Sequence, residues 1–299
     1  MSERELSILT AGYTFLEGLR WYQDRLWASD MYTGKVFAVG LKGDAEEIVR
    51  IPGQSSGLGW LPDGRLLISS MRDRKLLRRE PDGSLVEHAD LAALTEGHIN
   101  DMVVDAQGRA YVGNFGFDLM DGAQVKATNI VRADPDGSVR IVADGLYFPN
   151  GSFITPDGGT LIVNETLGNR ISAFDILPNG DLGPRRDWAR FGALPETHDP
   201  GALIGVLAIG PDGGALDAEG ALWVADAIGH RMVRVQQGGK ILEQIDTGSQ
   251  GVYAAALGGP KGTTLFMAIA PNFDEAERKA SLLGQILMTE VDVPRAGLP

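Results

Sequence analysis

The chain of 299 residues contains no cysteine. Disulfide bonds, cysteine-ligated zinc sites and thiol nucleophiles are therefore excluded. It also has no stretch approaching the ~18 consecutive apolar residues that a membrane-spanning helix needs. Residues 1–10 are charged and lack an apolar run, so we expect no signal peptide there. The expected location is the cytoplasm.

Basic residues are scarce: 27 Lys and Arg face 40 Asp and Glu, which gives a formal net charge of −13. Such a field repels phosphate, so neither nucleic acid nor an anionic membrane is an expected partner. An acidic surface is compatible with a cation site, although it more often serves only solubility. A hydrophobic content of 43% is enough for a sizeable core.

Long helical periodicity is also missing, and at most Asp90–Leu94 and Asp274–Ala280 could form a turn or two of helix. Instead, short apolar runs follow turns rich in Asp-Gly and Pro-Asp-Gly. Six such runs recur, at Arg25–Asp30, Arg65–Ser70, Arg109–Asn114, Thr160–Glu165, Ala221–Asp226 and Thr264–Ala268. Most are followed by a second, alternating run, which is typical of antiparallel strands.

Six copies of one multi-strand unit, each about 40 to 60 residues long, indicate an all-β, six-bladed β-propeller. We expect one domain spanning residues 1–299. A strand at Glu5–Leu9 is expected to pair with the last unit near Gly284–Val291 and so close the ring. A β-sandwich is the competing architecture, but it does not explain six repeats.

A propeller brings the starts of its inner strands together at one end of the channel. Glu17, Asn100, Asn150 and Asp212 each stand ahead of such a strand and beside a turn residue. Two carboxylates and two amide oxygens form a ligand set that suits a hard divalent cation, above all Ca²⁺. Each residue alone has a plainer reading, such as a surface acid for Glu17 or a turn for Asn150.

Several segments, in this order, resemble the senescence marker protein/gluconolactonase/regucalcin family over nearly the whole chain. They are Glu17-Gly18-Leu19-Arg20-Trp21, Ser56-Gly57-Leu58-Gly59-Trp60-Leu61-Pro62-Asp63-Gly64, Asn100-Asp101-Met102-Val103-Val104-Asp105, Phe148-Pro149-Asn150-Gly151, and Pro211-Asp212-Gly213 with Asp217–Ala225. The resemblance implies a six-bladed propeller with one divalent metal ion in the channel mouth.

The same resemblance assigns roles to individual residues. Glu17, Asn150 and Asp212 match the family's metal ligands, and Asp212 also matches the acid that activates water. Asn100 matches the position that contacts the substrate or metal-bound water. Where the family often has an arginine, this chain has His98, which puts a sugar lactone in doubt.

Other residues near these loops are candidates for the substrate pocket. We expect some of Phe115, Phe117, Leu146 and Phe148 to wall it, with Phe117, Phe148, His98 and Asn100 as the candidate substrate contacts. A packing role is as plausible for His98. Residues 196–209 are longer and more apolar than expected, and they form either a cover over the pocket or a plain surface loop.

The sequence thus predicts a metal-dependent hydrolase that opens a lactone ring. A divalent ion, with Ca²⁺ preferred over Zn²⁺, Mn²⁺, Mg²⁺ and Fe²⁺, would polarise the carbonyl while Asp212 assists the attack of water. The partner would be a small-molecule lactone or ester. Two alternatives stay open: a related esterase or phosphotriesterase, and a non-enzymatic propeller that binds calcium or a small molecule. The lactone, the native ion and the oligomeric state are not fixed by the sequence.

Overall fold

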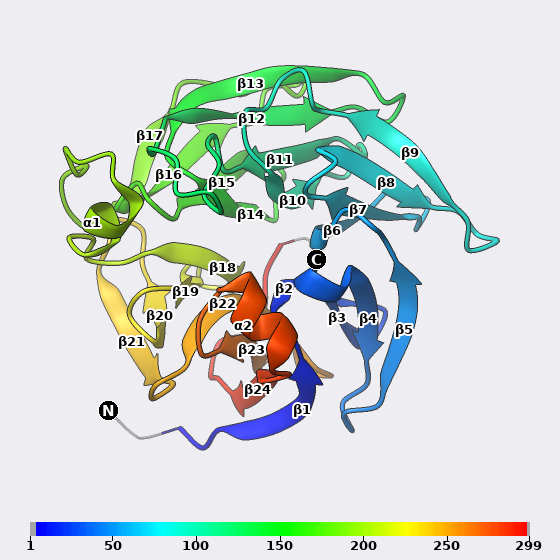
Figure 1. Cartoon of the computed structure of the whole chain (residues 1–299), viewed down its shortest axis with the longest axis vertical. Helices are drawn as coiled ribbons and strands as arrows, with labels where there is room; N and C mark the ends of the chain where they lie inside the picture. Colours follow the sequence, from blue (N-terminus) through cyan, green and yellow to red (C-terminus); the bar gives the residue numbers. More distant parts are fainter. Residues whose placement is uncertain (1–3, 298–299) are drawn as a thin grey trace.

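The computed structural model describes residues 4–297, about half of which lie in β-strands. The strands form six four-stranded antiparallel sheets, arranged as blades around one axis (Figure 1). The first strand of each blade lies innermost. Each inner strand contacts the next around the ring, and the last, β22, contacts the first, β2. The predicted six-bladed β-propeller is confirmed, and the sandwich alternative is wrong.

The first three blades follow the chain in order. Their strands are β2 (Leu16–Tyr22), β3 (Arg25–Asp30), β4 (Lys35–Val39) and β5 (Ala45–Arg50); β6 (Ser55–Trp60), β7 (Leu66–Ser70), β8 (Lys75–Arg79) and β9 (Leu85–Asp90); and β10 (Ile99–Val104), β11 (Ala110–Asn114), β12 (Thr128–Ala133) and β13 (Val139–Leu146).

The next three blades complete the ring. Their strands are β14 (Pro149–Ile154), β15 (Thr160–Glu165), β16 (Arg170–Asp175) and β17 (Arg186–Arg190); β18 (Pro211–Leu216), β19 (Leu222–Asp226), β20 (Arg231–Val235) and β21 (Ile241–Asp246); and β22 (Gly251–Gly258), β23 (Thr264–Ala270), β24 (Gly284–Glu290) and β1 (Ser7–Tyr13).

The sixth blade takes its outermost strand from the start of the chain. β1 pairs with β24 from Ser7 opposite Met288 to Tyr13 opposite Gly284. The sequence places this strand at Glu5–Leu9, so the prediction starts two residues too early and ends four residues too early. The strand continues because Leu9 and Tyr13 both reach the core between the sixth and first blades. This pairing removes the open edges that a ring of separate sheets would leave.

The hydrophobic core lies between the blades. Leu58 and Trp60 pack against Val36 across the first interface, and Trp223 packs near Val252 and Leu257 across the fifth. Each inter-blade interface has one such cluster, so both faces of every sheet are covered. A seventh cluster spans one end of the ring and includes Phe15, Phe115 and Phe148.

The turns between strands follow from the Asp-Gly chemistry seen in the sequence. Asp217 Oδ1 accepts hydrogen bonds from the amides of Glu219 and Ala221, at 2.9 and 3.0 Å. Gly220 adopts a φ of 75°, which favours glycine. The apolar run that follows is β19, the second strand of its blade, and the other five recurring runs are second strands in the same way.

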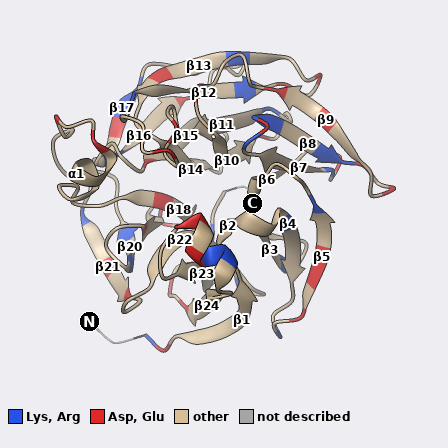
Figure 2. Ribbon diagram, viewed as in Figure 1, with Lys and Arg blue, Asp and Glu red and all other residues tan. Residues whose placement is uncertain are grey.

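Helical structure is limited to η1 (Met31–Thr33), α1 (Pro200–Ile204) and α2 (Glu275–Ala280) within residues 4–297. The expectation of a helical turn at Asp274–Ala280 holds, with Asp274 as the N-cap. No helix forms at Asp90–Leu94, where a turn follows β9 instead. None of the helices in the described part of the chain is long and apolar enough to span a membrane. Acidic and basic residues are spread over the outer strands (Figure 2).

Candidate active site

Five of the six inner strands carry a polar residue at their second position. These residues are Glu17 in β2, Ser56 in β6, Asn100 in β10, Asn150 in β14 and Asp212 in β18. All five are at least 94% buried. The sequence expectation set Glu17, Asn100, Asn150 and Asp212 ahead of the inner strands, whereas all four lie inside them. The apolar run that follows each one is the second strand of its blade, as β19 is for Asp212.

Glycines after these positions let the inner strands approach one another closely. A Cβ atom on Gly151 would lie 2.5 Å from the carbonyl oxygen of Asp212, and one on Gly213 would lie 2.7 Å from the Cα of Ala254. A Cβ on Gly18 would collide with the carbonyl oxygen of Ser56. A register shift follows the second position in each inner strand, and such shifts re-aim side chains. The polar residues therefore converge on the channel mouth.

The amide of Asn150 is held in one orientation. Its Nδ2 donates to Thr166 Oγ1 at 3.1 Å, and the Thr166 hydroxyl donates to the carbonyl oxygen of Pro211 at 2.8 Å. Asn164 Nδ2 donates to the carbonyl oxygen of Asp212, so the start of β18 is fixed by β15 and the turn after it. As a result Oδ1 of Asn150 is buried without a hydrogen-bond partner.

Oδ1 of Asp212 is likewise buried without a partner. Burial raises the pKa of Asp212 well above its ordinary value, and the negative charge of Asp101 adds to this shift. Burial also raises the pKa of Glu17 well above its usual range, with further contributions from Asp212 and Asp101. Two buried carboxylates of like charge are costly unless a cation or a proton compensates them.

Asn100 is held by its neighbour from the second blade. The Ser56 hydroxyl donates to Oδ1 of Asn100 at 2.8 Å, and both side chains are buried. The amide oxygen of Asn100 therefore points toward Ser56. The donor group of Asn100 is then the one left for the cavity, which Asn100 lines.

The four predicted residues Glu17, Asn100, Asn150 and Asp212 line a single cavity of about 80 Å³. Above them its walls are mainly apolar and aromatic. Phe115 and Phe148 contact edge to face, with ring centroids 4.4 Å apart. The ring centroids of Phe15 and Tyr253 lie 4.6 Å apart. No group of three or more His, Asp or Glu side chains in residues 4–297 is placed to hold a metal ion, so an ion here would depend on amide oxygens as well as carboxylates.

A family model described as the SMP-30/Gluconolactonase/LRE-like region matches residues 15–271. The chain belongs to this family. All four cavity residues lie within the matched region, whereas β1 and β24, which close the ring, lie outside it.

Named members of the family align over most of the chain. Pentonolactonase XacC of Haloferax volcanii is 27% identical over 256 residues, which is 85% of this chain and 81% of that protein. A 6-deoxy-6-sulfogluconolactonase of Pseudomonas putida is 22% identical, with 92% and 89% covered. A solved structure of a calcium-binding protein, regucalcin, from Agrobacterium tumefaciens has a TM-score of 0.79 at 20% identity and covers 100% of this chain and 99% of that one. At that identity the last comparison shows the fold alone.

Of the residues predicted to contact the substrate or wall its pocket, some line the cavity and others do not. Phe148 and Phe115 line the cavity beside Asn100. His98, Phe117 and Leu146 are not among its lining residues. His98 packs behind Phe115 at 5.8 Å between ring centroids, and burial lowers its pKa.

Residues 196–209 lie over this end of the ring, with Leu203 buried in the apolar cluster and Ile204 lining the cavity. A second loop, residues 115–127, meets them. The amide of Val125 donates to the carbonyl oxygen of His198 at 2.8 Å, and Nδ1 of His198 lies 3.1 Å from the Val125 carbonyl oxygen. The sequence left open whether residues 196–209 cover the pocket or form a plain surface loop. The structure shows that they contact the pocket.

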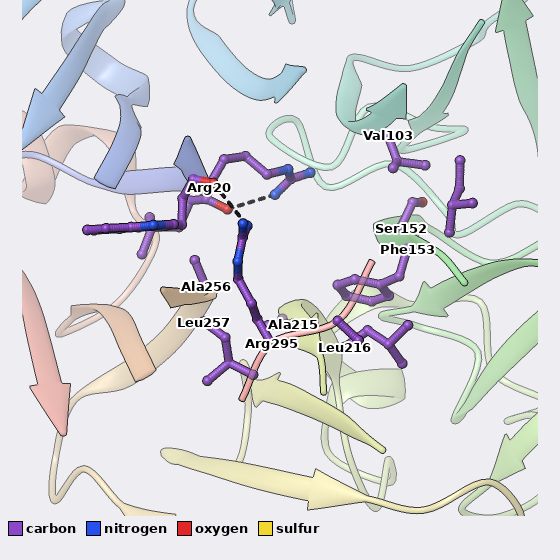
Figure 3. A pocket seen from close by; sticks show the side chains of 14 residues that line it. Arg20, Val103, Ser152, Phe153, Ala215, Leu216, Ala256, Leu257 and Arg295 are labelled. Atoms are coloured by element: carbon purple, nitrogen blue, oxygen red, sulfur yellow. Dashed lines mark hydrogen bonds between the residues drawn. The ribbon is translucent and has the colours of Figure 1, made fainter. Parts of the chain in front are cut away.

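A second pocket lies at the opposite end of the channel and is lined by a different set of side chains, which include Arg20 and Arg295 (Figure 3). Arg20 reaches across from the first blade to the third and pairs with Asp101 at 2.7 Å. Arg295 extends toward the same region, and its Nη1 lies 3.5 Å from the Trp21 carbonyl oxygen. The sequence motifs contained Arg20 and Asp101, but only their facing positions on β2 and β10 reveal this pair.

Proposed function

We propose that the protein is a divalent-metal-dependent hydrolase that opens a lactone, with Ca²⁺ as the expected ion. The observation that carries the proposal is the pair of buried, unpartnered oxygens on Asn150 and Asp212 beside the buried carboxylate of Glu17. The family relatives named pentonolactonase and 6-deoxy-6-sulfogluconolactonase support the choice of reaction.

The three expected ligands fit a hard cation. Glu17, Asn150 and Asp212 offer oxygen atoms only, which suits Ca²⁺ better than ions that favour nitrogen or sulfur. A positive ion would also offset the raised pKa of both carboxylates. The similarity to a protein named as calcium-binding points the same way. Zn²⁺, Mn²⁺, Mg²⁺ and Fe²⁺ stay as alternatives.

The chain's own residues supply the other parts of the reaction. When bound, a divalent cation polarises a carbonyl oxygen and acidifies water. The Asn100 amide, fixed by Ser56, donates a hydrogen bond to the lactone carbonyl oxygen. This hydrogen bond stabilises the negative charge that develops on that oxygen as water attacks. Asp212 accepts a proton from the attacking water at its second carboxylate oxygen, since the unpartnered Oδ1 is the one available to the ion. The water oxygen bonds to the carbonyl carbon, the ring C–O bond breaks, and the leaving alkoxide takes the proton back from Asp212 to give a hydroxy acid.

The test is hydrolysis by metal-stripped protein of a panel of sugar and non-sugar lactones, before and after each divalent ion is added back. We expect no turnover without metal and restored turnover with Ca²⁺. Tight calcium binding with no hydrolysis of any lactone would point instead to another hydrolysable bond, such as an ester or phosphotriester, or to a binding protein. The cytoplasmic location stays a prediction from the sequence.

Two variants separate ion binding from chemistry. Glu17→Gln should weaken calcium binding, measured by calorimetry, because it removes one of only two carboxylates. Asp212→Asn keeps an oxygen ligand but cannot accept the proton, so it should lose turnover by ~10²–10⁴-fold even at saturating calcium. Asp24→Asn, in the exposed turn after β2, is the matched control. Full activity of Asp212→Asn would refute the assigned role of Asp212.

A further inference from the structure

The walls of the active-site cavity carry almost no charge. Among the residues of 4–297 that line it, Glu17 and Asp212 at its floor are the only charged side chains, and no Lys, Arg or His joins them. The walls come from loops of several blades and include Phe15, Met31, Phe148, Ile228 and Phe273. A ligand seated on Asn100 therefore extends into apolar surroundings.

The few hydroxyl groups on the walls are mostly engaged within the protein. Tyr32 donates its hydroxyl to the carbonyl oxygen of Phe273. Thr166 donates to Pro211 and accepts from Asn150. Tyr253 contributes the one other hydroxyl among the lining residues. A ligand with many hydroxyl groups would thus find few partners above the floor of the cavity.

Unpaired hydroxyl groups are costly to bury. Each one placed against apolar side chains without a hydrogen bond lowers affinity by roughly 5- to 150-fold. An alkyl or aromatic group in the same place gains from leaving water. The same walls therefore disfavour a polyhydroxylated ring and favour an apolar one.

The side chains that cover the cavity are also apolar. Leu119 and Met120 come from the 115–127 loop, and Ile204 comes from α1. The Val125–His198 hydrogen bonds join these two segments. At about 80 Å³ the cavity is smaller than an engineered apolar cavity of ~150 Å³ that binds benzene, so we expect a bulky ligand to displace some of these side chains.

We propose that the substrate of this site is a lactone with an apolar body, an alkyl- or aryl-substituted ring, rather than a polyhydroxylated sugar lactone. This proposal rests on the proposed lactonase function. The ester group lies at the floor, against Asn100, Glu17 and Asp212. The apolar substituent lies between the aromatic walls and beneath the two joined loops.

Three lactones with the same six-membered ring test this: δ-valerolactone, which releases a primary alkoxide, and δ-nonalactone and glucono-δ-lactone, which both release secondary alkoxides. For the calcium-loaded protein, kcat/KM is divided by the spontaneous hydrolysis rate of each lactone at the same pH. We expect the ratio to rise at least ~10-fold from δ-valerolactone to δ-nonalactone. We expect δ-nonalactone to exceed glucono-δ-lactone by at least ~100-fold. A preference for glucono-δ-lactone, or no gain from the butyl chain, would overturn the proposal while leaving the lactonase function intact.

A variant at the cavity rim adds a second readout. Phe273 is 44% exposed, so Phe273→Ala should fold normally. It should lower kcat/KM for δ-nonalactone about 10-fold, mainly through KM, and leave δ-valerolactone within about twofold. Leu282→Ala, at a site that is 58% exposed and outside the cavity lining, is the control and should change neither.

A non-hydrolysable probe distinguishes the two possible failures. The lactam that corresponds to δ-nonalactone, 6-butylpiperidin-2-one, keeps the shape and carbonyl but resists hydrolysis. If no lactone is hydrolysed while this lactam binds in calorimetry and Phe273→Ala weakens it, the hydrolase function fails and the apolar site stands. If the lactam does not bind and no lactone is hydrolysed, both proposals are overturned.

Discussion

The Ser56 hydroxyl donates a hydrogen bond to Oδ1 of Asn100, at 2.8 Å and fully inside the protein. The two residues come from neighbouring inner strands, β6 and β10, 44 positions apart in the chain. An amide group has a donor side and an acceptor side of nearly equal shape. The serine therefore decides which side of Asn100 is presented to a ligand.

Ser56→Ala should lower kcat about 10-fold, because Asn100 can then rotate and offer its oxygen to the carbonyl group of the substrate. KM should change little, since the walls of the cavity are untouched. The measurement is steady-state hydrolysis at saturating calcium.

Ser69→Ala is the matched control for this substitution. Ser69 is equally buried in the same blade, but its hydroxyl has no hydrogen-bond partner. Its loss should leave kcat and the melting temperature unchanged. Equal effects of the two substitutions would indicate that Ser56 acts only through packing.

Arg20→Ala should destabilise the protein by about 3–5 kcal/mol, because it leaves the Asp101 carboxylate buried and unpaired. The side chains of this pair are only 9% and 5% exposed. Urea unfolding gives the free energy of unfolding for the variant and for the double variant Arg20→Met/Asp101→Asn, which should recover much of the loss. Arg25→Ala, which breaks the more exposed pair with Glu46, should cost at most about 1 kcal/mol. Similar losses for the two arginines would contradict this account.

Mild acid should destabilise the protein through His88. His88 is 94% buried in β9, and Arg78 Nη1 lies 3.2 Å from its Nδ1. Burial lowers the pKa of His88, and the Arg78 guanidinium lowers it further. Below the unfolded pKa of about 6.5 the unfolded chain binds more protons than the folded one, so stability present at pH 7.5 is lost as pH falls.

His88→Gln keeps an acceptor for Arg78 but does not titrate. Its free energy of unfolding should therefore fall less steeply between pH 7.5 and pH 5 than that of the parent, by up to about 1.4 kcal/mol per pH unit. The profiles are measured at saturating calcium, so that the ion proposed for Glu17 and Asp212 holds both carboxylates in the charged form. His98, whose pKa is also lowered, accounts for part of the slope that remains. Parallel profiles for parent and variant would exclude His88 as a source.

A disulfide across the ring closure should stabilise the protein. Ser7 and Met288 are directly opposite on β1 and β24, within the Cα separation that a disulfide spans. Because the chain has no cysteine, the double variant Ser7→Cys/Met288→Cys can form only this bridge within one molecule. Oxidation should add about 2–4 kcal/mol to the free energy of unfolding relative to the reduced form. A lower melting temperature after oxidation would mean that the bridge strains the pairing.

The blade pattern could be predicted because Asp-Gly turns and apolar runs are local signals that recur six times. The position of Glu17, Asn150 and Asp212 in equivalent places was visible for the same reason. Ser56 gave no such signal: it is a small residue in a glycine-rich segment, and its role depends on Asn100 in the next blade. The Arg20–Asp101 pair and the Val125–His198 contact join residues 81 and 73 positions apart, so no local pattern could reveal them.

The aromatic residues that line the cavity were the hardest to predict. Phe115 and Phe117 are two residues apart in one loop, yet only Phe115 faces the cavity. Phe273 and Tyr253, from the last blade, did not stand out in the sequence because their position at the mouth follows from ring closure. Loop conformation, rather than strand periodicity, decides which aromatic residue meets the ligand.

Because β1 pairs with β24, the ring can close only late in the synthesis of the chain. Ser7 leaves the ribosome 281 residues before its partner Met288. At about 5–20 residues per second, the first strand waits for tens of seconds with its hydrogen-bonding edge unpaired. The ring, and with it the buried channel mouth, can form only after translation has passed the last blade. A nascent chain of this protein is therefore exposed to chaperones, and to pairing with other chains, for nearly the whole of its synthesis.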